Sequence, residues 1–193
     1  MMKTLFLILS VLPAFLANLE QRVFQSDFNV TVAEDATQPL NYPGTITMHG
    51  SQFTLSMFGL EAAYDGQTLY LYNGDTDELT LSTPTEQELL QANPFLYAQS
   101  MVPLCDVTEQ PSANGEETVI TLTPKAEQQL PTGQTANKFV LKVRTADLMP
   151  LSLDIREGKR TTTLRLNSPH FLTSEPKYVL EPEPSTFVND MRF

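Results

Sequence analysis

The sequence has a single cysteine, Cys105, and no tryptophan. One cysteine excludes a disulfide within the chain, and no cysteine follows the apolar N-terminal run, where a lipid-modified one would stand. The apolar neighbours of Cys105 at 101–104 favour a buried side chain over a reactive thiol. The only two histidines, His49 and His170, share no ligand spacing with Cys105. We therefore expect no metal ion and no other cofactor.

Basic residues are also scarce, since 12 Lys and Arg face 23 Asp and Glu for a formal net charge of −11. Such a surface repels phosphate backbones, which argues against a nucleic-acid partner. A hydrolase needs a nucleophile, a base and an orienting acid within reach of each other. His170, in the run 168–171, lacks the glycines of a nucleophile elbow. We expect a binding protein and not an enzyme.

The N-terminus carries Lys3 and then an apolar run from Leu5 to Ala17 that is broken by the polar Ser10. Because a membrane-spanning helix needs about 20 apolar residues, the run is too short for a permanent anchor. It predicts a signal peptide over residues 1–17, cleaved near Ala14 or Ala17, and therefore export. The alternative is a buried N-terminal helix. Residues 18–193 are long enough for one domain with a continuous core.

Apolar residues alternate with polar ones almost everywhere after residue 27, which is typical of strands with one buried face. Short joints such as Asn73-Gly74 and Asn114-Gly115 suit tight turns, so consecutive strands are expected to be antiparallel neighbours. Alternation alone leaves one ambiguity, because a slip of one residue exchanges Leu69 and Leu71 for the tyrosines beside them.

One helical signal interrupts the strands. The run 83–86 places Thr83 as a helix N-cap, a proline at the first helical position and Glu86 as the partner in a capping box. It predicts a helix over residues 85–92, and Asn93-Pro94 repeats the signal for a second helix that extends through Met101. The predicted fold class is mainly β with short helices: an incomplete, strongly curved antiparallel β-barrel closed by a helical lid. Such an interior is either filled by side chains or holds an apolar ligand.

Four segments resemble the LolA family of outer-membrane lipoprotein carriers. The run YDGQTLYLYN at 64–73 is similar to the family's hairpin, with an aspartate-glycine turn before a strand rich in aromatic residues. The segments VITLTPK at 119–125, DLMPLSLDI at 147–155 and TFVND at 186–190 resemble later parts of the family pattern in the same order. The resemblance covers about residues 28–192.

The resemblance implies a monomeric carrier in the periplasm that accepts lipoproteins from an inner-membrane ABC transporter and delivers them to an outer-membrane acceptor. It implies an apolar cavity for the acyl chains, which alternation assigns to Phe28, Val30, Ile46, Met48, Phe53, Leu55, Met57, Leu69, Leu71, Leu153 and Ile155. The implied lid residues are Leu89, Leu90, Phe95, Leu96 and Met101.

Two departures from the family pattern stand out. The family's amphipathic helix before the first strand is expected to be shortened or missing, because only residues 18–26 separate the leader from that strand. The family's Arg-Pro pair before the strand of Phe53 is replaced by His49 and Gly50. His49 is either a pH-sensitive latch for the lid or an ordinary turn histidine. The alternative functions are a carrier of another lipid and an envelope interaction or sensor protein whose cavity is filled.

Overall fold

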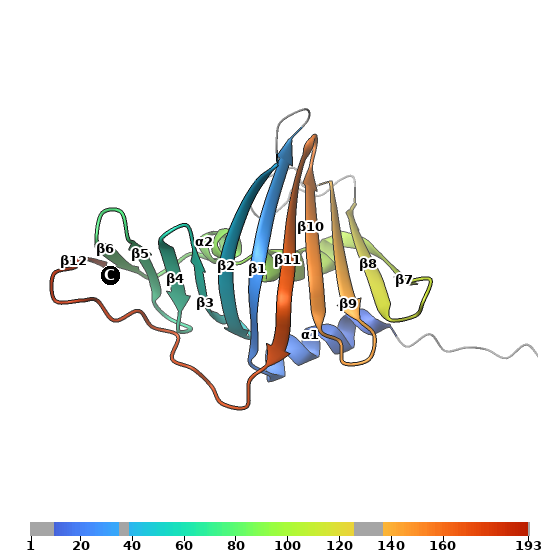
Figure 1. Cartoon of the computed structure of the whole chain (residues 1–193), viewed down its shortest axis with the longest axis horizontal. Helices are drawn as coiled ribbons and strands as arrows, with labels where there is room; N and C mark the ends of the chain where they lie inside the picture. Colours follow the sequence, from blue (N-terminus) through green and yellow to red (C-terminus); the bar gives the residue numbers. More distant parts are fainter. Residues whose placement is uncertain (1–9, 35–38, 126–136, 193) are drawn as a thin grey trace, which may run out of the picture.

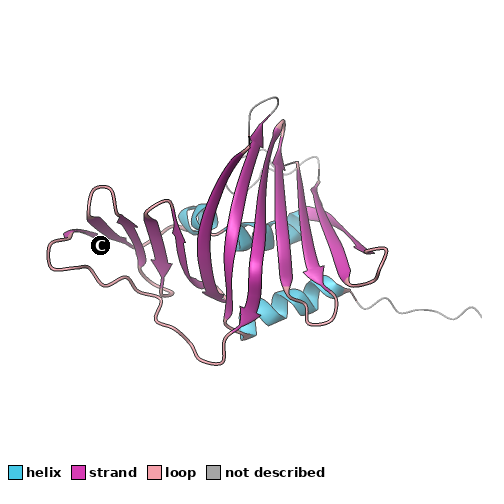
Figure 2. Ribbon diagram, viewed as in Figure 1, coloured by secondary structure: helices cyan, strands magenta, loops and turns pink. Residues whose placement is uncertain are grey.

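The computed structural model describes residues 10–34, 39–125 and 137–192, which form one large sheet with helices on one side of it (Figures 1 and 2). The helices are α1 (Val11–Gln21), α2 (Glu86–Ala92), α3 (Pro94–Met101) and the short 3-10 helix η1 (Val102–Leu104). The strands are β1 (Phe24–Glu34), β2 (Leu40–His49), β3 (Gln52–Met57), β4 (Leu60–Tyr64), β5 (Leu69–Asn73), β6 (Glu78–Ser82), β7 (Cys105–Pro111), β8 (Glu117–Pro124), β9 (Lys138–Arg144), β10 (Pro150–Glu157), β11 (Arg160–Phe171) and β12 (Phe187–Met191).

The sheet has 12 strands in the order β12-β6-β5-β4-β3-β2-β1-β11-β10-β9-β8-β7. The prediction of a mainly β fold with short helices is therefore confirmed. The predicted incomplete antiparallel barrel needs one correction, because β12 pairs with β6 in parallel and the sheet is therefore mixed. No hydrogen-bonded pairing joins β7 to β12 among the described strands, so the sheet is not closed into a barrel. The parallel pair arises because the segment 172–186 carries the chain along the sheet before β12 begins, instead of returning it through a tight turn.

Of the expectation that the helix before the first strand is shortened or missing, the second alternative is wrong, because α1 precedes β1. It occupies residues that the sequence pattern assigned to the leader, and it buries Leu12, Phe15 and Leu19 on one face. Spacings of three and four residues place these side chains on one stripe. Both predicted cleavage points lie inside α1, whereas residues 1–9 of the predicted signal peptide fall outside the described residues.

The two later helices begin where polar caps stand, but the first cap differs from the prediction. Thr85, not Thr83, accepts a hydrogen bond from the backbone N–H of Glu88, whose carboxylate accepts one from the N–H of Thr85 in return. The capping box is thus two residues later than predicted, and Glu88 replaces Glu86 in it. Asn93 confirms the second signal, since its side-chain oxygen accepts hydrogen bonds from the N–H groups of Phe95 and Leu96.

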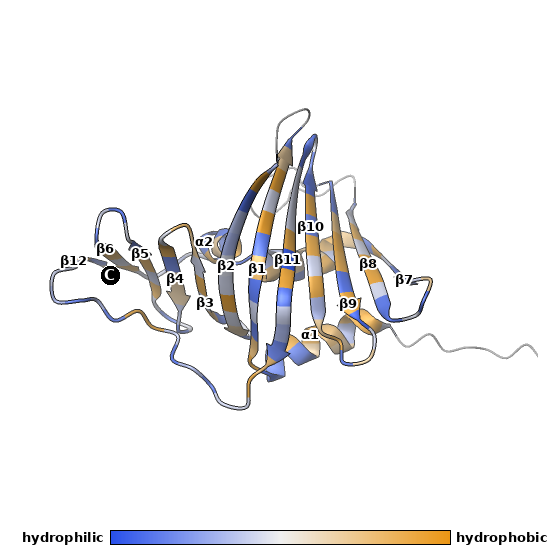
Figure 3. Cartoon of the chain, in the orientation of Figure 1, coloured by the Kyte–Doolittle hydropathy of each residue, from blue (hydrophilic) through white to orange (hydrophobic). Residues whose placement is uncertain are grey.

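The two faces of the sheet carry different layers. The helices cover the concave face, where the hydrophobic core lies, and the orange stripes of Figure 3 follow the alternation along the strands. The segment 172–186 runs over the opposite, convex face of β4–β6, where Ala63, Leu79 and Tyr178 are buried. The end of the sheet formed by β3–β6 is therefore covered on its convex side by chain that carries no regular structure.

Candidate functional site

All eleven residues predicted to line the cavity lie on the concave face. The pairing of neighbouring strands shows this directly, because two residues that lie opposite each other on adjacent strands point to the same side of the sheet. Leu55 pairs with Ile46 on one side and with Ala62 on the other, and Ala62 pairs with Leu71. Leu69 and Leu71, and not the tyrosines between them, therefore face the concave side.

The concave face divides into two regions of different character. We call the first the covered half: the concave face of β1, β2 and β8–β11 together with α1 and α3. Four of the predicted cavity residues are almost fully buried here: Phe28, Ile46, Met48 and Leu153. Phe53 and Leu69 are also buried, at one end of β3 and β5. The cavity that remains between α1, α3 and β8–β10 has a volume of only about 20 Å³. Side chains fill the space beneath α1, whereas a pocket of about 210 Å³ remains where Leu90 and Tyr97 of the helices approach Ile155 and Thr162 of β10 and β11.

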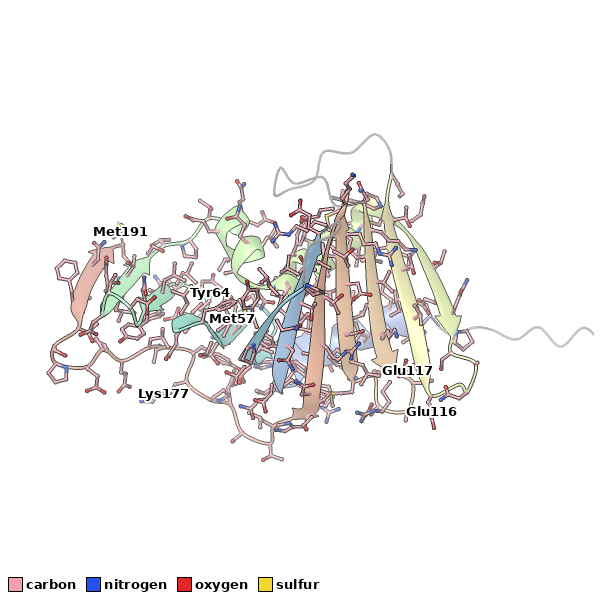
Figure 4. The ribbon with its side chains drawn as sticks, turned by 45° about the horizontal axis from the view of Figure 1, so that its top comes forward. Met57, Tyr64, Glu116, Glu117, Lys177 and Met191 are labelled. Atoms are coloured by element: carbon pink, nitrogen blue, oxygen red, sulfur yellow. The ribbon has the colours of Figure 1, made fainter. Side chains whose placement is uncertain are left out.

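The second region, which we call the open groove, lies on the concave face of β3–β6 beside the end of α2. It has a volume of about 400 Å³. Its lining has an apolar floor of Leu55, Met57, Leu60, Ala62, Leu71 and Ala92, with Asn73, Glu78 and Thr80 towards β6 and with Glu61 and Tyr72 at its margin. Leu60 is 49% exposed and Leu71 is 42% exposed. Figure 4 shows Met57 on this part of the sheet, between the helices and the edge that ends at Met191.

Three aliphatic residues of the groove escaped the sequence prediction, namely Leu60, Ala62 and Ala92. Leu60 and Ala62 alternate with Glu61 in β4, so the same period of two that identified Leu55 and Met57 was present there. The strand is short and contains two adjacent alanines, which weakened the signal. Ala92 had no local signal, because its place in the groove depends on where α2 ends.

The predicted lid residues lie on α2 and α3 and pack into the concave face. Leu90, Phe95 and Met101 are buried, and Leu89 and Leu96 are partly buried against the same core. Phe95 meets Phe24 of β1 edge to face, with ring centroids 6.0 Å apart. The lid helices are thus seated on the covered half, and only the end of α2 reaches the groove.

His49 stands at the end of β2 and contacts the C-terminal segment. Its Nδ1 lies 2.8 Å from a carboxylate oxygen of Glu175. The neighbouring Gly50 donates its backbone N–H to the carbonyl of Leu19 at 2.9 Å, and Gln99 of α3 donates to the carboxylate of Glu20 at 3.0 Å. The C-terminal end of α1 is therefore tied to the β2–β3 turn and to α3 by groups other than the His49 ring.

The N-terminal end of α1 is held by a residue that sequence reasoning missed. Glu109 of β7 accepts hydrogen bonds from the hydroxyl of Ser10 at 2.6 Å and from the N–H groups of Val11 and Leu12 at 2.7 and 3.0 Å. Burial alone raises the pKa of Glu109, but these three bonds outweigh it and hold the pKa below its ordinary value. The partners are about a hundred residues apart in the chain, so no local pattern signals the contact.

Asp65, in the motif that carries the strongest family resemblance, has a local role in the structure. Its carboxylate accepts hydrogen bonds from the N–H groups of Gln67 and Thr68 and from the hydroxyl of Tyr70. Burial opposes ionisation, yet these bonds lower the pKa of Asp65. This carboxylate shapes the β4–β5 turn and is not available as a ligand.

Two features are absent from the described part of the chain. No helix in residues 10–34, 39–125 or 137–192 is long and apolar enough to cross a membrane. Within the same ranges no three His, Cys, Asp or Glu residues come together as metal ligands would.

No family model and no curated protein sequence matches this chain. Among solved structures, an uncharacterised conserved protein from Thermus thermophilus has a TM-score of 0.60 at 11% identity, covering 93% of this chain and 96% of that one. A putative outer membrane lipoprotein-sorting protein domain from Vibrio parahaemolyticus has a TM-score of 0.45 at 10% identity, covering 86% and 93% of the two chains. A LolA superfamily protein from Nitrosomonas europaea has a TM-score of 0.41 at 13% identity, covering 85% and 94%. At 11% identity, the similarity to the Thermus protein shows a shared fold over most of both chains and nothing more.

Proposed function

We propose that this protein is a periplasmic carrier that binds the acyl chains of lipoproteins in its open groove. It receives them from an inner-membrane ABC transporter and releases them to an outer-membrane acceptor, and it performs no catalytic step. The observation that carries the proposal is the groove itself. A space of about 400 Å³ with an apolar floor stays open on the concave face of β3–β6, whereas the space beneath α1 is filled by side chains.

The exposed leucines of the groove give the physical argument. Leu60 and Leu71 are about half exposed to water, so they stabilise the folded protein less than buried leucines would. An exposed apolar surface of this kind favours a binding role. Each methylene that an acyl chain buries there contributes about 0.8 kcal/mol. Of the polar residues in the lining, Glu61 and Tyr72 pair beside Leu79 and direct their side chains to the convex face, and Asn73, Glu78 and Thr80 stand towards β6. Binding to the apolar floor of the groove therefore depends mainly on contact area.

A carrier must also release its cargo. The unbranched side chain of Met57 can repack around ligands of different shape, which suits a site that binds without a unique geometry. The net charge of −11 disfavours residence on anionic membranes and keeps the carrier free to move between its donor and acceptor.

The test compares two glutamate substitutions at equally exposed apolar positions. Leu71, 42% exposed, lines the groove, whereas Val188, 44% exposed, pairs beside Leu79 and therefore faces the convex side. Native mass spectrometry measures the uptake of a purified triacylated lipoprotein from detergent. We expect Leu71→Glu to lower the affinity at least about tenfold, because it places a charge against buried methylenes. Val188→Glu should bind like the unaltered protein.

Three outcomes decide the proposal. Uptake of lipoprotein that is lost only in Leu71→Glu supports it. Uptake that both variants retain places the cargo elsewhere and contradicts the groove as its site. An unaltered protein that takes up free fatty acid or phospholipid but no lipoprotein contradicts the lipoprotein part of the proposal and favours a carrier of another lipid.

A second candidate function rests on the covered half. The residual volume of about 20 Å³ beneath α1 is what an envelope interaction or sensor protein with a filled interior would show. Such a protein would use an outer surface for a protein partner and would remain empty when lipid is offered. The same uptake experiment separates it from the carrier.

A further inference from the structure

We propose that β12 is a self-association edge, at which two copies of this chain pair antiparallel about a two-fold axis through Asn189 and continue each other's sheet. The family resemblance implied a monomer, and this inference replaces that expectation. It goes beyond the proposed function and does not depend on what the open groove binds.

The free edge of β12 exposes apolar side chains. Strand β12 stands at one end of the sheet order, with β6 as its only neighbour among the described strands (Figure 1). Of the eight large apolar residues that are exposed in the described part of the chain, three lie in this five-residue strand. They are Phe187 at 65%, Val188 at 44% and Met191 at 45% exposure. A cluster of this kind on a folded surface favours an interaction site.

The two edges of the sheet differ in how they discourage pairing. Soluble proteins protect edge strands with charged side chains and prolines. Strand β7 carries Asp106, Glu109 and Pro111. Strand β12 has no proline, and its single charged residue, Asp190, forms an ion pair with Arg192 just beyond the strand. The segment 187–192 therefore carries no net charge in a chain of −11, so two copies can approach each other through it.

The backbone groups of β12 alternate between β6 and the free edge. Phe187 donates its N–H to the carbonyl oxygen of Asp77 at 3.0 Å, at the start of the parallel ladder with β6. In a parallel ladder every second residue of a strand bonds to the same neighbour. Phe187 and the residues two and four positions later therefore face β6, whereas Val188 and Asp190 present their N–H and C=O groups at the free edge.

These four outward groups match those of a second copy. When Asn189 lies opposite Asn189 of the second copy, Val188 of each copy lies opposite Asp190 of the other. Each of these two pairs exchanges two hydrogen bonds, because both residues direct their N–H and C=O groups to the shared edge. All four outward groups of each copy are then satisfied. A two-fold contact between identical surfaces is the arrangement that most homodimers use.

The side chains on the concave face agree with the same register. Asn189 pairs with Thr80, and Thr80 pairs with Leu71, so Phe187, Asn189 and Met191 share the concave face with the open groove. The register places Phe187 of each copy opposite Met191 of the other, which gives two pairs of an aromatic ring and a thioether across the axis. Two open grooves then lie on one continuous face, each lined by a single copy.

The small size of the contact sets its strength. A stable complex commonly buries about 1,600 Å², which is more than one pair of five-residue strands offers. We therefore expect a reversible dimer with a Kd of about 10–100 µM. Sedimentation equilibrium of the full chain, residues 1–193, at about 5 to 300 µM should show the average mass rising from one chain towards two. Val188→Pro removes an outward N–H and keeps the bonds of β12 to β6, so it should weaken association at least about tenfold.

Cysteine substitutions test the register in a Cys105→Ala background. Asn189→Cys lies on the axis, where the two Cα atoms of a non-hydrogen-bonded pair stand about 4.5 Å apart and can form a disulfide. The matched control is Val188→Cys, which lies about 8 Å from its own counterpart, beyond the reach of a disulfide. Val188 is more exposed than Asn189, so exposure alone favours the control. We expect the covalent dimer of Asn189→Cys to form at least about tenfold faster under mild oxidation.

Association that Val188→Pro weakens, together with faster cross-linking at position 189, supports the proposal. An unaltered chain that stays monomeric up to the highest concentration refutes it, which is also the result if the edge takes an extended segment of a different protein. Association that Val188→Pro leaves unchanged, or equal cross-linking at positions 188 and 189, refutes it as well. Lipoprotein uptake is read separately through Leu71, so a dimer that takes up no lipoprotein contradicts the carrier and leaves this interface standing.

Discussion

The covered half and the open groove are built from the same alternating strands, yet one is packed and the other is open. In the covered half, Phe139 and Leu153 are about 1% exposed beneath α1 and α3. In the groove, Leu71 sits at a comparable position on its strand and is 42% exposed. The strand pattern is therefore not what separates the two regions. The two regions differ because of where the three short helices lie.

This division gives the two regions different tasks. A packed half supplies most of the buried apolar area and so most of the stability of the domain. A region that contributes less to folding can expose apolar surface and change its contacts without loss of the fold. The convex layer over β4–β6, which buries Leu79 and Tyr178, supports the strands of the groove from behind.

The largest expected effect comes from emptying the packed half. Phe139 packs edge to face on Tyr97 of α3, with ring centroids 5.2 Å apart. Phe139→Ala removes that contact and leaves a cavity, so we expect a loss of about 3–5 kcal/mol in the free energy of unfolding, measured by urea denaturation. Leu71→Ala, the matched change in the groove, should cost less than about 1 kcal/mol. Equal losses at the two sites would contradict the division into a packed and an open region.

A smaller effect is expected at the border between the two regions. Gly44 of β2 has no room for a side chain, because an added Cβ would stand 2.5 Å from the backbone carbonyl oxygen of Ser56 and would also meet the ring of Phe28. Gly44→Ala forces the β2–β3 pair apart, and we expect it to lower the free energy of unfolding by about 1–3 kcal/mol.

The control for this change is Gly74→Ala, in the turn after β5. Its added Cβ would lie 3.0 Å from the carbonyl oxygen of Gly59 and 3.8 Å from the ring of Tyr72, which demands a smaller adjustment. Thermal unfolding followed by circular dichroism ranks the two variants. A larger loss at Gly74 would show that the border strands are not closely packed.

Alternation was sufficient to predict the concave face from the sequence. A period of two is a local property of the chain, and it placed Phe28, Leu55 and Leu71 on the correct side of their strands. The Asn93 cap was predicted correctly for the same reason, whereas the first capping box was assigned to Thr83 and lies at Thr85. Features set by neighbours in sequence were therefore predictable.

Features that depend on contacts between residues far apart in the sequence could not be predicted. The apolar run to Ala17 fits both an export signal and the start of an amphipathic helix, and only the sheet beneath α1 shows that Leu12, Phe15 and Leu19 form a buried stripe. The parallel pairing of β12 depends on the path of the segment 172–186. Whether a concave residue is packed or exposed depends on which helix lies over it, which explains why Phe28 and Leu71 were predicted to belong to one site.

The smallest expected effect is a pH dependence confined to α1. The pKa of Glu109 is depressed in the folded state relative to an ordinary glutamate near 4.3, so its contribution is complete above that value and is lost as pH falls through the folded pKa. The groups that set this shift are Ser10, Val11 and Leu12, none of which titrates. Acid should therefore loosen α1 before it unfolds the sheet.

Amide protection factors, which correct for the intrinsic effect of pH on exchange, measure this loosening. Between about pH 5 and pH 3, we expect protection in α1 to fall in the unaltered protein while protection in β8 and β9 is retained. Glu109→Gln keeps an oxygen acceptor but cannot titrate, so its α1 should be less protected at neutral pH and insensitive to acid over this range. Asp106→Asn should follow the unaltered protein. A parallel loss of protection in α1 and β9 would mean that acid acts on the whole domain, through other carboxylates with lowered pKa values such as Asp65, and that the Glu109 contact does not control α1 separately.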